Sequence, residues 1–349
     1  SCIMSEINAY KCTPRQVRSH ICDCLDAGLV PFIQGSPGVG KSSIIKEIAN
    51  EAHLKLIDHR LSTSTPEDLS GLPRFNERGH AQFVPFADLF PIAGTEVPDG
   101  KNGWMLFLDE FNSASKGVQA ACYKLILDRM TGQVPLHENV VIVAAGNLST
   151  DRAITNPIST AMQSRVVHLI MQIDFTEWLL DVALKNNYDS RIVAYLSQYP
   201  NKLMDFDPDH NENTFCCPRT WGFMNRLIQG KNVTEDKAAL YAGTITSGVA
   251  LDFIQFTKVY ASMINVRDIL ADPTGCPIPY DTATKWAVIT HIMEKVTNDN
   301  FDKLTLYISR FSMDFRVLFF RSIMIRKPEL RRHNAFIAAM AQMSKYLYD

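Results

Sequence analysis

The chain has 349 residues, 46% of them apolar, which is the composition of a globular protein with a sizeable core. Its formal net charge is −2, which disfavours a generally basic nucleic-acid-binding protein but leaves a local basic patch open. No apolar run approaches the ~20 residues of a membrane-spanning helix, and no basic segment followed by an apolar one marks a secretory signal.

Strand-like and helix-like segments alternate through the first half of the chain. Thr13 and Pro14 have the residue types of a helix cap and first turn. A helix follows them, and further helices are predicted after the strands, including one at 43–52 and a short capped one that begins at Thr65. Strands are predicted at 29–34, 54–58, 104–108, 140–145 and 166–170. Strands separated by helices indicate βαβ units, and therefore a mainly parallel five-stranded sheet flanked by helices.

Two excursions interrupt this alternation. Residues 71–90 carry Gly, Pro and Asn around a short apolar run, which predicts a small hairpin. Residues 129–139 contain Gly132 and Pro135 and form a second, shorter excursion. After about residue 174 the strand signals stop, so the remainder is predicted to be helical.

The stretch GSPGVGKS after the first predicted strand matches the phosphate-binding pattern G-x-x-x-x-G-K-[ST]. Between a strand and a helix, free N–H groups and the helix dipole hold phosphate oxygens. We expect Lys41 to reach the β- and γ-phosphates and the Ser42 hydroxyl to ligate Mg²⁺. A Gly-rich turn without a ligand is the alternative, which the strand–turn–helix context disfavours. The predicted nucleotide-binding residues are Gly35, Ser36, Pro37, Gly38, Val39, Gly40, Lys41, Ser42 and Ser43.

Two more predicted strands end in polar residues. Asp109 and Glu110 follow the run 104–108, at the end of a strand where ligands of open α/β sheets bind. We expect Asp109 near Mg²⁺, through its water shell, and Glu110 to polarise the water that attacks the γ-phosphate. Asn147 follows the next strand and can orient that water or contact the γ-phosphate. Solvated acids and a plain Gly-Asn turn are the alternatives, and the order of the three signals favours hydrolysis.

The succession GSPGVGKSS, LFLDEFNSAS, VIVAAGN, AMQSR and CPRTWG resembles the AAA+ ATPases, most closely the MoxR-like branch with its dynein- and midasin-related neighbours. The resemblance covers roughly residues 13–230. It implies ATP as the nucleotide. It also implies a P-loop AAA+ α/β core over 1–173 with a helix-2-type insert at about 71–90, an all-α lid over 174–262 and a C-terminal helical region over 263–349.

The resemblance also implies a role for two arginines. Arg165 lies where AAA+ proteins carry the arginine finger, which reaches the nucleotide of the neighbouring subunit and stabilises charge on the transferring phosphoryl group. Arg219 resembles sensor 2, at the start of a lid helix that Pro218 would begin, while Asn147 resembles sensor 1. Surface or capping roles are the alternatives for both arginines. Arg152 and Arg129 are rivals of Arg165 for the trans-acting role.

A trans-acting arginine requires an oligomer, so we expect a homo-oligomeric ring, hexameric by the resemblance, that hydrolyses ATP with Mg²⁺. The resemblance implies chaperone-like remodelling or activation of a protein target, often beside a protein with a von Willebrand factor A domain. A nucleic-acid-acting motor, such as a DNA translocase or helicase loader, is the alternative, which the near-neutral charge disfavours. A nucleotide-dependent scaffold with little turnover is a third, against which Asp109 and Glu110 argue.

Four other groups of residues have weaker signals. The eight scattered cysteines lack zinc-site spacing and are expected to be free, buried thiols, which favours a reducing, cytoplasmic location. In the 71–90 insert, Phe75, Phe83 and Phe86 either contact a partner or fill a small core. The tryptophans are expected to pack in cores. A cluster of basic residues is expected on a solvated face, with an acidic partner or nucleic acid as the alternative: Arg321, Arg326, Lys327, Arg331 and Arg332.

Overall fold

A computed structural model describes residues 11–86, 88–148, 156–261 and 265–347. The chain folds into two compact units. The first comprises Ser1–Ile173 with Asp207–Asp209, and the second comprises Asp174–Phe206 with His210–Asp349. Over the described residues, none of the helices has the length and apolar character needed to cross a bilayer.

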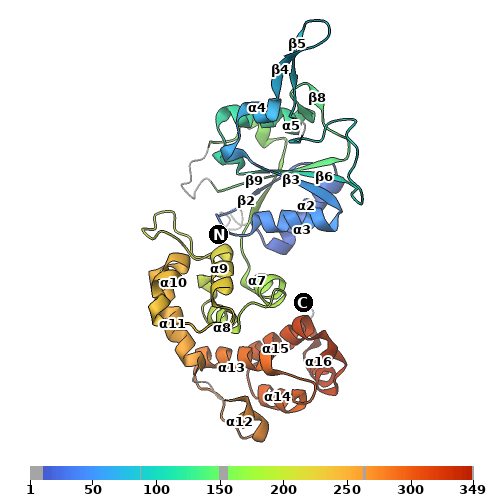
Figure 1. Cartoon of the computed structure of the whole chain (residues 1–349). Helices are drawn as coiled ribbons and strands as arrows, with labels where there is room; N and C mark the ends of the chain where they lie inside the picture. Colours follow the sequence, from blue (N-terminus) through green and yellow to red (C-terminus); the bar gives the residue numbers. More distant parts are fainter. Residues whose placement is uncertain (1–10, 87, 149–155, 262–264, 348–349) are drawn as a thin grey trace, which may run out of the picture. The chain divides into compact units, whose positions relative to one another are not determined.

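The first unit is built on a parallel sheet of six strands in the order β1-β10-β2-β9-β6-β3 (Figure 1). The strands are β1 (Lys11–Cys12), β2 (Pro31–Gln34), β3 (Leu54–Arg60), β6 (Gly103–Asp109), β9 (Val140–Gly146) and β10 (Val167–Met171). The predicted P-loop α/β fold is confirmed, but the predicted count of five strands is one too low. The additional strand, β1, pairs with β10 through two residues at the sheet edge, which is too short to show a hydrophobic period.

Helices cover both faces of this sheet, with α2 and α3 on one face and α4 and α5 on the other (Figure 1). Their bounds are α2 (Pro14–Asp26), α3 (Lys41–Glu51), α4 (Pro66–Ser70), α5 (Lys116–Asp128) and, before β10, α6 (Thr160–Gln163). The strand β6 is buried from Gly103 to Leu108, because its alternate side chains meet helices on opposite faces. Leu106 and Leu108 pack in one cluster with Val118 of α5.

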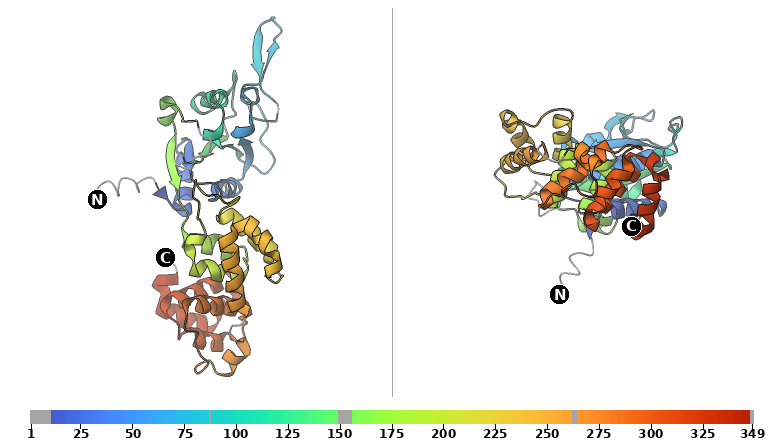
Figure 2. Two further views of the ribbon diagram at one scale, coloured as in Figure 1. Left: turned by 90° about the vertical axis from the view of Figure 1, so that its left-hand side faces the viewer. Right: turned by 90° about the horizontal axis from the view of Figure 1, so that it is seen from below.

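Two antiparallel hairpins leave the sheet. The strands β4 (Leu72–Phe75) and β5 (Ala81–Val84) form a hairpin that projects from the body of the first unit (Figures 1 and 2). At its base Gly71 has a φ of 83°, and a Cβ there would lie 2.1 Å from the Val84 oxygen, so only glycine fits. The second hairpin is formed by β7 (Met130–Thr131) and β8 (Val134–Pro135). Both lie where the sequence predicted an excursion.

The second unit is helical. Its longer helices are α8 (Ser190–Gln198), α9 (Pro218–Ile228), α10 (Ala238–Ile245), α11 (Ser247–Ala261), α13 (Thr282–Lys295), α14 (Phe301–Ile308), α15 (Met313–Arg326) and α16 (Asn334–Leu347). Shorter elements are α7 (Phe175–Trp178), the π-helical turn η4 (Leu179–Leu184) and α12 (Val266–Ala271). Tyr195, Trp221 and Phe253 are fully buried, with ring centroids 5.3–5.9 Å apart. Three of the four tryptophans are buried and Trp286 is half-buried, as expected for packing residues.

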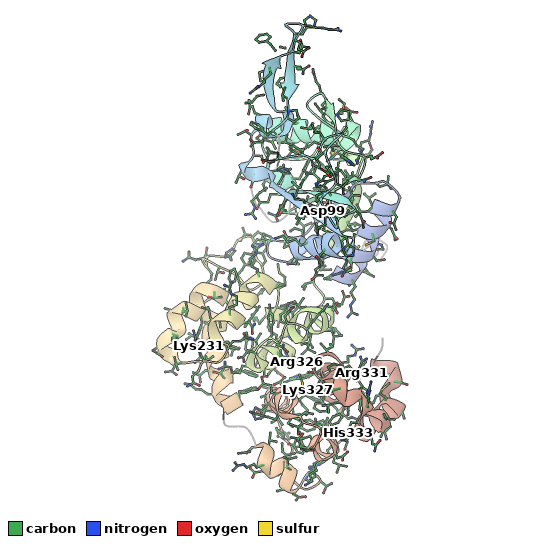
Figure 3. All side chains as sticks on the ribbon, turned by 45° about the vertical axis from the view of Figure 1, so that its right-hand side comes forward. Asp99, Lys231, Arg326, Lys327, Arg331 and His333 are labelled. Atoms are coloured by element: carbon green, nitrogen blue, oxygen red, sulfur yellow. The ribbon has the colours of Figure 1, made fainter. Side chains whose placement is uncertain are left out.

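The expectation of a solvated basic face is wrong for Arg326 and Lys327, which are labelled in Figure 3. Arg326 donates to the main-chain oxygens of Leu184, Ala183 and Tyr188 at 3.2, 3.4 and 3.1 Å, and burial lowers its pKa. Lys327 donates to main-chain oxygens at the end of α13, Glu294 at 3.2 Å among them. These long side chains turn inward because helix ends leave carbonyl groups without intrahelical partners. Arg331 and Arg332 are exposed.

None of the cysteines among the described residues is joined to another in a disulfide. Six of them are buried, whereas Cys22 is exposed on α2, so the expectation of burial is wrong there. Cys22 and the buried Cys24 lie two residues apart on this helix and therefore face in different directions.

Candidate functional site

Polar residues at the carboxyl ends of β2, β9 and β6 gather at one edge of the sheet. These three strands are neighbours, and their register pairs Gln34 with Gly146 and Leu108 with Ala144. The loop after β2, Asn147 after β9 and the carboxylates after β6 are therefore adjacent. The structure thus brings together the P-loop, Asp109, Glu110 and Asn147, which the sequence analysis had singled out separately.

The loop between β2 and α3 has the backbone of an anion-binding turn. Gly38 and Gly40 have φ values of 77° and 106°, which favour glycine, and α3 begins directly after them at Lys41. A Cβ at Gly35 would lie 3.1 Å from Val39 Cγ1 and 3.2 Å from the Met171 oxygen. The N–H groups of the first turn of α3, which includes Ser42 and Ser43, lack intrahelical acceptors and are available to phosphate oxygens.

Lys41 and Ser42 connect this loop to the neighbouring strand ends. The Lys41 ammonium donates to the main-chain oxygens of Gly35 and Ser36 and lies 3.5 Å from Asn147 Oδ1. The Ser42 hydroxyl donates to Asp109 Oδ2 at 3.3 Å. Burial raises the pKa of the Asp109 carboxyl, and the charges of Asp58 and Glu110 act in the same direction. The Glu110 N–H, which donates to Asp109 Oδ1 at 2.8 Å, and the Lys41 charge oppose that rise.

Glu110 has a left-handed backbone, with φ 55° and ψ 40°, a conformation that costs a residue other than glycine roughly 1 kcal/mol. It precedes the 3₁₀ turn η2 (Phe111–Ser113). Its carboxylate accepts a hydrogen bond from the Ser62 hydroxyl, in the turn η1 (Leu61–Thr63) that follows β3. Ser62 was not predicted from the sequence as a site residue. Its only signal is a polar side chain after a strand, and that signal is informative only once β3 is known to lie beside β6.

This donor set fits a nucleotide with Mg²⁺. A hydroxyl and a carboxylate are hard oxygen ligands, and Mg²⁺ usually takes one or two protein oxygens together with substrate phosphates. Within the part of the chain that the structure describes, no group of three or more His, Cys, Asp or Glu side chains is placed to hold a metal. An ion at Ser42 and Asp109 would therefore take its remaining ligands from phosphate oxygens and water.

The arginines of the sequence analysis differ in their surroundings. Arg165 is exposed and lies between α6 and β10. Arg129 is half-buried, and its guanidinium donates to the main-chain oxygens of His137 at 3.1 Å and Val140 at 2.8 Å. Arg152 lies outside the described residues. Arg219 is exposed in the first turn of α9, which begins at Pro218 as expected.

A second missed residue is Asn112, which is 6% exposed. Its side-chain amide donates to the Asn147 oxygen at 2.6 Å and accepts from the Asn147 N–H at 3.1 Å. The sequence offered only a polar residue near the two carboxylates, because its partner lies 35 positions later in the chain.

Sequence comparison matches residues 32–168 to the family described as ATPase family associated with various cellular activities (AAA), so the P-loop core carries an AAA family domain. No curated protein sequence matches the chain significantly. Solved structures with similarity include a candidate ATPase from Cytophaga hutchinsonii, at 13% identity, with 91% of this chain and 83% of that chain covered and a TM-score of 0.36. A variant of Thermotoga maritima RuvB has 16% identity, with 85% and 87% covered and a TM-score of 0.38. These scores are too low to carry an argument.

Proposed function

We propose that this chain is an ATPase subunit of a homo-oligomeric ring of MoxR-like type, hexameric, that uses ATP hydrolysis to remodel a protein partner. The observation that carries the proposal is the convergence of Lys41, Ser42, Asp109, Glu110 and Asn147 at three adjacent strand ends. The family match over residues 32–168 supports ATPase activity at the level of the family. The ring, the partner and the MoxR-like branch rest on the resemblance and on the exposed Arg165.

The residues have distinct tasks in this proposal. The P-loop N–H groups and Lys41 bind and orient the phosphates. Mg²⁺, held through Ser42 and Asp109, would supply neutralisation of the charge that develops on the phosphate oxygens. Glu110 accepts a proton from the attacking water, and Asn147, whose Oδ1 lies 3.5 Å from the Lys41 ammonium, orients that water.

The first experiment is Glu110→Gln, which keeps the shape of the side chain and removes its charge. We expect unchanged ATP affinity and turnover reduced by about 10²-fold or more, the usual contribution of a general base. Glu96→Gln, at an exposed position of the same unit, is the matched control and should keep full turnover. Retained turnover in Glu110→Gln would remove Glu110 from the role of base.

The trans-acting role of Arg165 is tested by mixing two inactive variants. Lys41→Ala subunits cannot bind ATP productively but carry Arg165, whereas Arg165→Ala subunits bind ATP but lack the finger. In a ring with head-to-tail interfaces, random mixing restores roughly a quarter of the sites. Recovery of about that fraction supports action in trans, and mixed rings without any recovery would contradict it. Arg267→Ala, an exposed control in the second unit, should stay active alone.

The hairpin β4–β5 favours a protein partner over nucleic acid. Phe75, Phe83 and Phe86 are 81%, 44% and 39% exposed, so they do not fill a small core. Exposed apolar clusters are typical of protein contacts, whereas nucleic-acid motors rely on basic surfaces. We expect an unfolded polypeptide to stimulate turnover, and Phe75→Ser to abolish that stimulation without changing basal turnover. Stimulation by DNA with a steep salt dependence would favour the nucleic-acid alternative instead.

A further inference from the structure

The contact between Asn112 and Asn147 replaces a strand pairing. The ladder between β6 and β9 ends at the pair Leu108 and Ala144, and β6 itself ends one residue later at Asp109. Beyond this point the Asn112 amide donates to the main-chain oxygen of Asn147 and accepts from its N–H, as a neighbouring strand would. The Asn112 side chain therefore pairs with both the main-chain N–H and the main-chain oxygen of Asn147, so the position of Asn147 depends on Asn112.

Gly146 makes room for this contact. A Cβ at Gly146 would lie only 2.0 Å from Asn112 Oδ1. Gly146 does not have a left-handed φ, so the space taken by the Asn112 amide, rather than backbone conformation, requires glycine here. The glycine of the Ala145-Gly146-Asn147 sequence is thus explained by Asn112.

Asn112 and helix α5 also hold the segment that leads to Arg165. The main-chain oxygen of Asn112 accepts from the Asn156 N–H at 2.6 Å, and Gln119 Nε2 donates to the Asn156 oxygen at 3.1 Å. Gln119 is 2% exposed and also donates to the Phe111 oxygen at 3.3 Å. The Tyr123 hydroxyl of α5 accepts from the N–H of Ser159, the cap of α6.

We propose that Asn112 and Gln119 are positioning residues that hold two catalytic elements on one platform, the turn η2 and helix α5. Asn112 fixes Asn147 within its own site, and Gln119 fixes the segment 156–165 that presents Arg165 to the neighbouring site. The inference rests on the proposed function, since it assigns how the hydrolytic residues are held. These positions separate hydrolysis from ATP binding, because the side chains of Asn112 and Gln119 donate to main-chain oxygens of Asn147, Phe111 and Asn156, which lie outside the P-loop.

The first test is Asn112→Asp, which places a carboxylate oxygen against the Asn147 carbonyl in a side chain of equal size. We expect kcat to fall at least about tenfold, as for loss of one buried hydrogen bond in an oriented site, while the Kd for ATP stays within about twofold. Asn300→Asp is the matched control, because Asn300 also accepts from a main-chain N–H, of Thr297 at 2.7 Å, and donates to an oxygen, of Lys295 at 3.0 Å. That control should keep the wild-type kcat.

The second test approaches the contact from its other side. The single variant Gly146→Ala should have a lower kcat than wild type. In the Asn112→Ala background, the addition of Gly146→Ala should not lower kcat further, because the clashing amide has been removed. If Asn112→Asp does not fold, as judged by circular dichroism, Gly146→Ala decides the question. Losses that multiply in the double variant would contradict the inferred contact.

Gln119 is tested in the mixed rings. Subunits with Lys41→Ala and Gln119→Leu should restore the activity of Arg165→Ala subunits at least about fivefold less well than Lys41→Ala subunits do. Equal restoration would overturn the role of Gln119. If the wild-type chain hydrolyses ATP and a folded Asn112→Asp variant has the same kcat, the role of Asn112 is overturned but the proposed function is not. If the wild-type chain does not hydrolyse ATP, the proposed function is overturned and this inference with it.

Discussion

The inward-facing side chain of Arg326 allows the unfolding free energy of a variant of the second unit to be predicted. Arg326→Met keeps much of the aliphatic length of the side chain but removes the guanidinium and its three hydrogen bonds to Leu184, Ala183 and Tyr188. A hydrogen bond from a charged donor contributes about 1.5–3 kcal/mol net. If Arg326 lay on a solvated face, the change would alter the unfolding free energy by less than about 0.5 kcal/mol.

Two observations reduce the loss of stability expected from removing the three hydrogen bonds together. The Ala183 oxygen keeps a hydrogen bond from the Tyr188 N–H at 2.9 Å, and the Leu184 oxygen keeps one from the Asn187 N–H at 3.3 Å, so neither acceptor is orphaned. Removing the guanidinium also relieves the desolvation that lowers its pKa. We therefore expect a loss of about 2 kcal/mol, which corresponds to a fall in Tm of roughly 4–8 °C for a unit of this size.

Denaturant unfolding monitored by circular dichroism measures this loss, with an unchanged m value as the sign that only stability has changed. Arg331→Met is the matched control, because Arg331 is exposed in the adjacent turn. It should shift the unfolding free energy by less than about 0.5 kcal/mol. An Arg326→Met variant as stable as Arg331→Met would refute the reasoning.

Two further predictions concern the first unit. Ser62→Ala frees the Glu110 oxygen that now accepts from the Ser62 hydroxyl, so we expect turnover to rise by about 2–10-fold at saturating ATP; a fall would instead assign Ser62 to orienting Glu110. Burial lowers the pKa of His59 from its ordinary 6.5, partly opposed by its hydrogen bond with the Leu89 oxygen. The unfolded chain therefore binds the proton more readily just below pH 6.5, and His59 makes stability fall as the pH drops through that window. His59→Gln should lose less unfolding free energy than wild type between pH 7.5 and 5, and equal losses would argue against this role.

The sequence predicts best those features that depend on a short stretch of chain. The buried run of β6 and the glycines of the P-loop are local patterns, and each appears where expected. The edge strand β1 escapes prediction because two residues carry no period. The inward course of Arg326 escapes it because a helical pattern places the Cα of a long side chain but does not say where its charged end goes.

The missed residues of the site have a common cause. Ser62 contacts Glu110 and Asn112 contacts Asn147 only because β3, β6 and β9 are neighbours in the sheet. Chain order does not reveal strand order, and the polar residues of each loop look alike before that order is known. The proximity of Lys41, Ser42, Asp109 and Glu110 could be predicted because a known pattern already joins these residues across the chain.

The strand order also determines when the sheet can form during synthesis. The strand β2 lies between β10 and β9, both of which are made roughly a hundred residues or more after it. At about 5–20 residues per second, β2 waits on the order of 10 s for its first partner. During that time Phe32 and Ile33, which are buried in the folded unit, have no sheet to enter. The strand β2 therefore needs protection from aggregation on the ribosome until β9 has been made.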